Sequence, residues 1–176
     1  MEVRLQKYVQ QPIADSDEWK GVSRLADDLH RHLNTDSALA LIREANQPGR
    51  SSAIVQATFG EFAREMGFES ERTGLFGSDE FALRPDYFLR LAGTDTGILL
   101  EVERGKTTIN NMDLLDFWKC HLCRHAHYLF LLVPLALRQN ATMSPRNEFA
   151  TVARRLQRFF VLGNHTNVRG LCLFGY

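Results

Sequence analysis

Ile98-Leu99-Leu100-Glu101-Val102-Glu103 is the stretch of sequence that decides the fold. Side chains alternate between the two faces of a β-strand, so Glu101 and Glu103 point the same way. The alternate residues are apolar and face the core: Ile98, Leu100 and Val102. Upstream, Arg84-Pro85-Asp86 lies on a second segment with a strand pattern. If the two segments pair, Asp86 joins the glutamates. Carboxylates this close repel unless a cation lies among them, so the sequence predicts a divalent metal site.

The connection between the two acidic segments has the composition of a turn. Residues 93–97 read Gly-Thr-Asp-Thr-Gly, which predicts a hairpin that joins a strand over residues 81–91 to the strand over residues 98–103. Pro85 cannot donate a ladder hydrogen bond, so the first strand should be an edge strand or irregular there.

Composition limits the class of protein. The chain has 176 residues, 44% of them hydrophobic, which suits a compact α/β domain. Lys plus Arg and Asp plus Glu each number 21, so nucleic-acid binding would need a locally basic face. The apolar run over residues 128–137 is too short for a bilayer and is broken by Pro134, and no signal peptide is recognisable. A cytoplasmic protein with reduced cysteines is expected.

Periodicity predicts the remaining elements. Residues before about Asn46 read as helical, and a helix should run from Ser51 to Gly67. A helix over residues 111–124 should bury one apolar face, with Trp118 in the core and Phe117 on a partner surface; that face comprises Met112, Leu115, Trp118 and Leu122. The other expected elements are strands at 68–72, 127–133 and 168–174 and a helix at 146–162. We divide the chain into a helical N-terminal extension (1–48), packed on the same domain, and an α/β core (49–176).

The ordered combination resembles the PD-(D/E)xK nuclease superfamily, whose core order is α-β-β-β-α-β. The resemblance runs from about Ser51 to Val133 and implies a restriction-endonuclease-like mixed central sheet flanked by helices. Asp86 corresponds to the motif aspartate, Glu101 to the acidic residue after the hairpin, and Glu103 to the usual lysine. Glutamate at that position is similar to the E-x-E variant of BamHI-like restriction endonucleases, while the related BglII-like enzymes carry glutamine there.

The resemblance implies a Mg²⁺-dependent DNA endonuclease, with Mn²⁺ as a substitute ion. The metal ligands would be Asp86, Glu101 and the Val102 carbonyl, and Glu103 would orient or deprotonate the attacking water. Glu61 is similar to the helical glutamate that some members add to the metal shell, and Glu65 is the alternative. Two lysines could replace the missing one: Lys106 and Lys119. Cutting both strands of a duplex would require a homodimer.

Basic residues are the candidates for phosphate contacts. They are Arg84, Arg104 and Lys106 near the acidic strands, and Arg154, Arg155 and Arg158 on the C-terminal helix. A solvated helix face explains the last three equally well. Zinc is not expected, because Cys120-x-x-Cys123 is followed by no second such pair, and other ligands would have to come from His125, His127, His165 or Cys172.

The missing motif lysine leaves a second function open. A catalytically inactive protein of the same fold could bind DNA or a protein partner, as in plasmid replication or mobilisation proteins with a nuclease-like domain.

Overall fold

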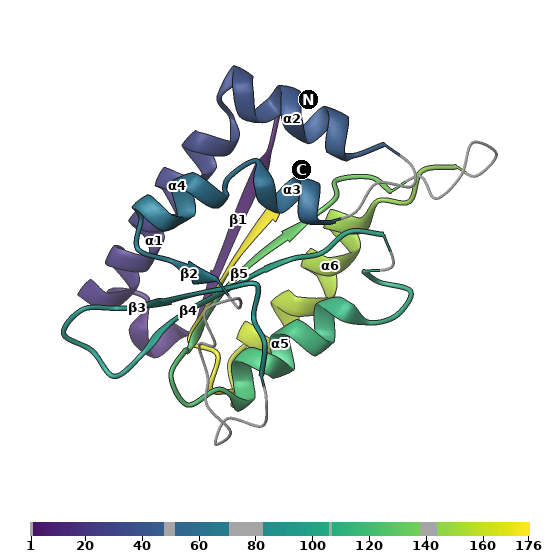
Figure 1. Cartoon of the computed structure of the whole chain (residues 1–176). Coiled ribbons are helices and arrows are strands. Elements are labelled where there is room, and N and C mark those ends of the chain that lie inside the picture. The colour runs from purple at the N-terminus through teal and green to yellow at the C-terminus, as the bar shows by residue number, and fades with distance from the viewer. Residues whose placement is uncertain (1, 48–51, 71–82, 106, 138–143) are drawn as a thin grey trace.

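The computed structural model of the chain describes residues 2–47, 52–70, 83–105, 107–137 and 144–176. Helices and strands alternate from residue 97 onward (Figure 1). The elements in order are β1 (Arg4–Val9), η1 (Gln11–Ile13), α1 (Asp17–Leu33), α2 (Asp36–Ala45), α3 (Ser52–Ala57), α4 (Gly60–Glu65), β2 (Glu69–Ser70), β3 (Tyr87–Arg90), β4 (Gly97–Val102), α5 (Met112–Leu122), β5 (Tyr128–Val133), α6 (Glu148–Leu156), η3 (Gln157–Phe160) and β6 (Gly170–Gly175).

A six-stranded mixed sheet with the order β1-β6-β5-β4-β3-β2 forms the middle layer. The central strands β4, β5 and β6 run parallel, while β1, β2 and β3 join antiparallel. Helices α1 to α4 cover one face, and α5 and α6 cover the other (Figure 1). Every residue of the three central strands is buried, as expected of strands covered on both faces.

Alternation along β4 divides the apolar core into two clusters. Ile98, Leu100 and Val102 pack with residues of α1 to α4, and Leu99 packs with residues of α5 and α6. The sequence predicted this alternation. Glu101 therefore points to the same face of the sheet as Leu99, toward α5, where it is 4% exposed.

The N-terminal region is only partly helical, so our prediction for the residues before Asn46 was wrong at its start. Helices α1 and α2 form as expected, and each begins at a hydroxyl cap: Ser16 accepts a hydrogen bond from the Trp19 N–H, and Thr35 accepts one from the Ala38 N–H. Before them, however, β1 pairs along its whole length with β6. β1 is an edge strand and is only half-buried. Its sequence therefore contains few apolar residues and lacks a clear strand pattern.

The helix predicted from Ser51 to Gly67 consists of two short helices. Thr58 interrupts it, because its hydroxyl donates to the Val55 carbonyl at 2.7 Å and competes with the helical ladder. Phe59 then leaves helical geometry with φ −132° and ψ 0°. The predicted end is confirmed: Gly67 has φ +92°, a conformation that favours glycine after a helix.

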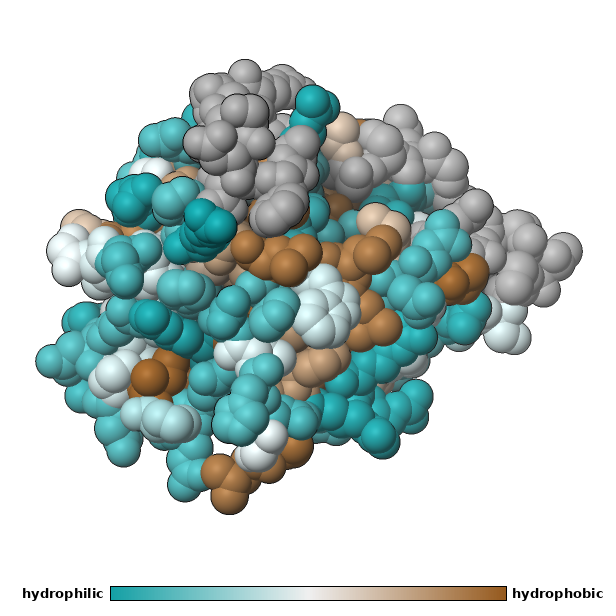
Figure 2. All heavy atoms as spheres, turned by 90° about the horizontal axis from the view of Figure 1, so that it is seen from below, coloured by the Kyte–Doolittle hydropathy of each residue, from teal (hydrophilic) through white to brown (hydrophobic). Residues whose placement is uncertain are grey.

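The buried face of α5 is not the one we predicted. Leu115, Trp118 and Leu122 are 54%, 44% and 52% exposed, whereas Phe117 is fully buried, so the roles of Trp118 and Phe117 are reversed. Figure 2, which views the molecule from below, shows apolar surface patches among hydrophilic ones. The residues that α5 buries are Asp113, Asp116, Phe117 and Cys120. A prediction based on hydrophobicity alone was wrong here, because two of the buried residues are aspartates.

The predicted hairpin is confirmed, with β3 shorter than expected. Tyr87 pairs with Leu100 and Arg90 with Gly97, and β3 begins only after Pro85 and Asp86. The strand at 68–72 appears as the two-residue β2, and the loop at 73–78 lies outside the described residues. Within the described ranges, no helix is both long and apolar enough to cross a membrane.

Gly97, the first residue of β4, has no room for a side chain. An added Cβ would lie 2.4 Å from the Leu89 carbonyl oxygen and 2.6 Å from the Phe88 ring. We expect Gly97→Ala to lower the free energy of unfolding by about 3 kcal/mol, because the nearest obstacle is backbone. Urea denaturation followed by circular dichroism measures this. The control is Gly21→Ala in α1, where an added Cβ meets nothing within 4 Å and should stabilise the helix by up to about 1 kcal/mol. Equal stability of the two variants would contradict the prediction.

Candidate metal-dependent active site

Asp86 and Glu101 lie side by side at the end of the hairpin. Because Tyr87 pairs with Leu100, Asp86 falls opposite Glu101 in the strand register. Each carboxylate accepts a hydrogen bond from the other strand's backbone: the Val102 N–H donates to Asp86 Oδ2 at 2.8 Å, and the Asp86 N–H donates to Glu101 Oε2 at 3.3 Å. These two bonds hold the predicted carboxylates together.

Helix α5 adds a cation and a further carboxylate to this pair. Lys119 Nζ lies 2.6 Å from Glu101 Oε1 and 3.2 Å from Asp116 Oδ1. The side chains of Glu101 and Asp116 are only 5% and 2% exposed, while that of Lys119 is 23% exposed. Lys119, one of our two candidates for the missing lysine, is therefore in contact with the acidic pair.

Glu103 faces the same cluster from the end of β4. Burial raises the pKa of Glu103 to about 8, and repulsion by Asp116 and a hydrogen bond with Asp116 add to this shift. Two ionised carboxylates cannot hydrogen-bond to each other, so one proton or a cation must be shared between them. Without a metal ion, Glu103 is thus largely protonated at neutral pH.

The pKa shifts of Glu101 and Lys119 also reflect an excess of negative charge in the cluster. Burial raises the pKa of Glu101 well above its ordinary value, Asp116 raises it further, and the Lys119 ammonium opposes both effects. Burial alone would lower the pKa of Lys119, but Glu101 and Asp116 raise it above its ordinary value. Lys119 therefore stays charged and neutralises one of the carboxylates. A divalent cation would relieve the repulsion that remains.

The residues fit a hard metal ion by donor chemistry, without forming a complete shell. Among the described residues, no three His, Cys, Asp or Glu side chains are arranged to hold a metal ion together. The donors at the site are all carboxylate oxygens, which Mg²⁺ prefers and usually supplements with water. Asp116 Oδ2 is buried, and no N–H or hydroxyl group of the described residues donates to it. The hydrogen bond with protonated Glu103 is the contact that can serve this carboxylate.

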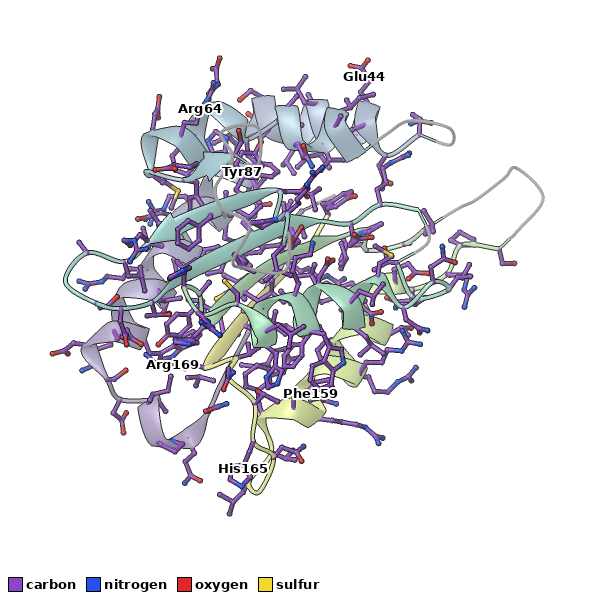
Figure 3. All side chains as sticks on the ribbon, turned by 60° about the horizontal axis from the view of Figure 1, so that its bottom comes forward. Glu44, Arg64, Tyr87, Phe159, His165 and Arg169 are labelled. Atoms are coloured by element: carbon purple, nitrogen blue, oxygen red, sulfur yellow. The ribbon has the colours of Figure 1, made fainter. Side chains whose placement is uncertain are left out.

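A cleft of about 410 Å³ opens beside Asp86, between α3, α4 and the β2–β3 edge of the sheet. Glu61 lines this cleft together with Asp86, Arg64 and Tyr87. Figure 3 shows Arg64 on the helical layer and Tyr87 between that layer and the sheet. Glu65 is exposed one turn further along α4. Glu61 thus shares a cavity with a predicted metal ligand, which favours it over Glu65.

Of the other cations predicted near the acidic strands, Arg84 and Arg104 lie within the described residues. Arg84 is exposed two residues before Asp86, and Lys106 lies outside the described residues. The Arg104 guanidinium donates to the Gln47 carbonyl, while its Nε is buried with no hydrogen-bond partner in the described ranges. Arg84 and Arg104 remain candidates for phosphate contacts.

The three arginines predicted on the C-terminal helix differ in their exposure and ion pairing; Arg154 and Arg155 lie on α6, and Arg158 lies on η3. Arg154 and Arg158 are exposed, whereas Arg155 Nη1 lies 3.0 Å from the fully buried Asp113 Oδ1. All three line a shallow depression with Leu114 and Phe159. Arg155 is therefore held in a structural ion pair, which leaves Arg154 and Arg158 for a ligand.

The cysteines lie in the core. Cys120, Cys123 and Cys172 are buried and form no disulfide bond, and Cys120 Sγ contacts the Ala126 carbonyl oxygen at 3.7 Å. Burial raises the pKa of the Cys120 and Cys172 thiols, so both stay protonated.

Sequence reasoning missed Asp116. The available signal was its position three residues before Lys119, a spacing at which helical side chains of opposite charge meet. We assigned the inward face of α5 to apolar residues, and Asp116 was not among them.

Comparison with solved structures finds the restriction endonuclease BglII in complex with a DNA 16-mer. The TM-score is 0.50 at 10% sequence identity, and the likeness covers 99% of this chain and 78% of that chain. No protein-family profile and no curated protein matches the sequence. Similarity at this identity concerns the fold: the chain has a restriction-endonuclease-like fold, with a mixed six-stranded sheet flanked by helices, as the resemblance implied.

The pKa of Glu103 predicts a pH-dependent change in stability. Glu103 has a pKa of about 8 when folded and about 4.5 in an ordinary environment, so between these values the folded protein binds a proton that the unfolded chain lacks. Stability from this group therefore falls as pH rises from 5 to 9. Glu103→Gln removes the titration, so in EDTA its stability relative to the parent should increase over this range by about 2 kcal/mol, after allowance for solvent screening.

Chemical denaturation at pH 5 and pH 9 measures this difference. Glu65→Gln, at an exposed position on α4, is the control and should differ from the parent equally at both pH values. A Glu103→Gln variant that gains no stability relative to the parent between pH 5 and pH 9 would show that Glu103 is ionised throughout.

Proposed function

We propose that this protein is a Mg²⁺-dependent DNA endonuclease of the restriction-endonuclease type. The observation that carries the proposal is the pair of hydrogen bonds that places the two carboxylates side by side: Asp86 accepts from the Val102 N–H, and Glu101 accepts from the Asp86 N–H. Lys119 is in contact with Glu101. Carboxylates and a lysine that meet at the end of a hairpin are the groups that phosphodiester hydrolysis needs. The restriction-endonuclease-like fold supports the same conclusion, although fold alone does not establish activity.

Asp86, Glu101 and the Val102 carbonyl would hold the metal ion, and Glu61 would complete its surroundings from across the cleft. When bound, Mg²⁺ would neutralise charge on the phosphate oxygens and lower the pKa of a coordinated water. Glu61 is suited to an indirect contact, because it is exposed in the cleft that Asp86 also lines. Mn²⁺ would substitute, since it prefers the same oxygen donors.

Glu103 would accept the proton of the attacking water, and Lys119 would stabilise the negative charge that develops on the phosphate. Glu103 can accept a proton from the attacking water only after it has lost its own, and a divalent cation beside it favours the ionised form. Lys119 stays charged and can stabilise the extra negative charge on the phosphate in the transition state. Lys106 remains the alternative to Lys119 for this role.

Basic side chains would hold the DNA backbone. Arg84 and Arg104 flank the acidic strands, and Arg154 on α6 and Arg158 on η3 offer exposed guanidinium groups. Such contacts give affinity without sequence information. One chain carries one site, so cleavage of both strands of a duplex would require a homodimer.

A second function is favoured by one specific observation. Lys119 already pairs with both Glu101 and Asp116, and no three acidic side chains in the described ranges are arranged around a shared ion position. A protein whose acidic cluster is satisfied internally in this way would bind DNA or a protein partner without cutting. Retention of DNA without cleavage in any divalent metal would identify this alternative.

Removal of the proposed metal ligands should abolish cleavage. We expect Asp86→Asn and Glu101→Gln each to reduce the cleavage rate by about 10²-fold to 10³-fold, because each removes a charge that would hold the metal. The measurement is the conversion of supercoiled plasmid in Mg²⁺, Mn²⁺ or EDTA. Direct linearisation would indicate a dimer, and accumulation of nicked circles a monomer.

The two glutamates of α4 provide a matched pair in the same assay. Glu61→Gln should slow cleavage about 10-fold because Glu61 lines the cleft, whereas Glu65→Gln should cleave like the parent. Full activity of Asp86→Asn or Glu101→Gln would refute the proposed site.

The exposed arginines on α6 and η3 should contribute to DNA affinity. We expect Arg154→Ala with Arg158→Ala to weaken DNA binding and to reduce the slope of log K against log salt concentration by about 2, one for each lost phosphate contact. Fluorescence anisotropy in Ca²⁺ or EDTA measures this without cleavage. Arg24→Ala, an exposed arginine on α1 across the sheet, is the control. An unchanged salt slope would place the DNA elsewhere.

A further inference from the structure

We infer that Asp116 is a positioning residue, which holds the Lys119 ammonium against Glu101 and thereby lets a lysine on α5 do the work of the lysine absent from β4. The inference rests on the proposed function and deepens it. It assigns a role to the one buried carboxylate of the cluster that the sequence did not predict.

Two fixed points define the position of Lys119 Nζ. Glu101 Oε1 lies 2.6 Å away on β4, and Asp116 Oδ1 lies 3.2 Å away on the same helix. A lysine side chain has four rotatable bonds and no rigid geometry of its own, so a single partner leaves it free to swing about the contact. Two partners on different elements restrict it to one place, beside Glu101.

Asp116 occupies a site where a carboxylate is costly. Its side chain is 2% exposed, and its neighbours on the inner face of α5 include Phe117 and Cys120. Burial raises the pKa of Asp116, and the contact with Lys119 opposes that rise. An apolar side chain at this position would pack against the same core without a desolvation penalty. Fold stability therefore does not account for a carboxylate there, whereas orientation of Lys119 does.

Asp113 provides an internal comparison. It is buried on the same face of α5 one turn earlier, and it also pairs with a cation, Arg155 at 3.0 Å. Arg155 also donates to the Thr108 carbonyl and to Asn111 Oδ1, so this pair fixes the segment that leads into α5. Its contacts are structural. The two aspartates differ in whether their cation touches the Asp86–Glu101 pair.

A double-mutant cycle tests the inference. We compare kcat at saturating DNA in Mg²⁺ for the parent, Asp116→Ala, Lys119→Met and the double variant. If Asp116 acts through Lys119, each single change lowers kcat, by about 10²-fold for Lys119→Met, and the double variant is no slower than Lys119→Met. Losses that multiply in the double variant would overturn the inference.

Further variants separate positioning from structural support. Asp116→Asn keeps an oxygen that can accept from Lys119, so it should recover part of the kcat that Asp116→Ala loses. Asp113→Asn should lower the melting temperature but leave kcat within about 2-fold of the parent. An Asp116→Asn variant that is as slow as Asp116→Ala, or an Asp113→Asn variant that is equally slow, would overturn the inference.

Metal binding supplies a readout that does not depend on activity. Titration of Mn²⁺ into each protein by calorimetry should give similar affinities for Asp116→Asn and the parent, since a positioning residue does not hold the ion. Loss of Mn²⁺ binding in Asp116→Asn would make Asp116 a ligand and would overturn the inference. A parent that cleaves no DNA in either metal would overturn the proposed function together with this inference, whereas an active parent with an equally active Asp116→Ala variant would overturn the inference alone.

Discussion

The hydrogen bonds between Asp86 and the backbone of Val102, and between Glu101 and the backbone of Asp86, are the contacts on which the site depends. They bring two carboxylates together that would otherwise repel. Backbone N–H groups can do this because they carry partial positive charge and cannot move away from the strand. The hairpin is thus both the scaffold of the acidic pair and part of its charge compensation. The negative charge gathered there raises the pKa of both Glu103 and Lys119.

Helix α5, which packs on the face of the sheet where Glu101 points, supplies a positive charge to this cluster through Lys119. Its inner face carries Asp116 and Lys119 toward β4, and its outer face leaves Trp118 and Leu122 in solvent. The face of α5 that packs against the sheet thus carries an ion pair, while large apolar side chains of the same helix stay partly exposed. Glu103 follows β4 directly, and the Lys119 ammonium reaches Glu101 from α5. The site therefore keeps a positive charge while Glu103 can still take up a proton.

The local elements were predictable from sequence because their signals are local. Alternation in β4, the glycine turn at residues 93–97 and the serine and threonine caps of α1 and α2 each act within a few residues. The adjacency of Asp86 and Glu101 followed from the hairpin. Strand β1 was missed because its partner, β6, is remote in sequence, and the inner face of α5 was missed because its carboxylates are stabilised by Lys119 and Arg155 only after folding. A hydrophobicity pattern cannot predict the burial of a polar side chain, because that burial depends on a partner the pattern does not show.

The pairing of β1 with β6 has a consequence for how the chain assembles. Arg4 lies opposite Gly175, so these strands come from opposite ends of the described chain. During synthesis, β1 leaves the ribosome long before β6 exists, and until then its backbone groups have no native ladder to join. Closure of the sheet on that side is therefore a late event, and a nascent chain stalled before β6 would carry an open sheet edge on β5 that favours association with other chains.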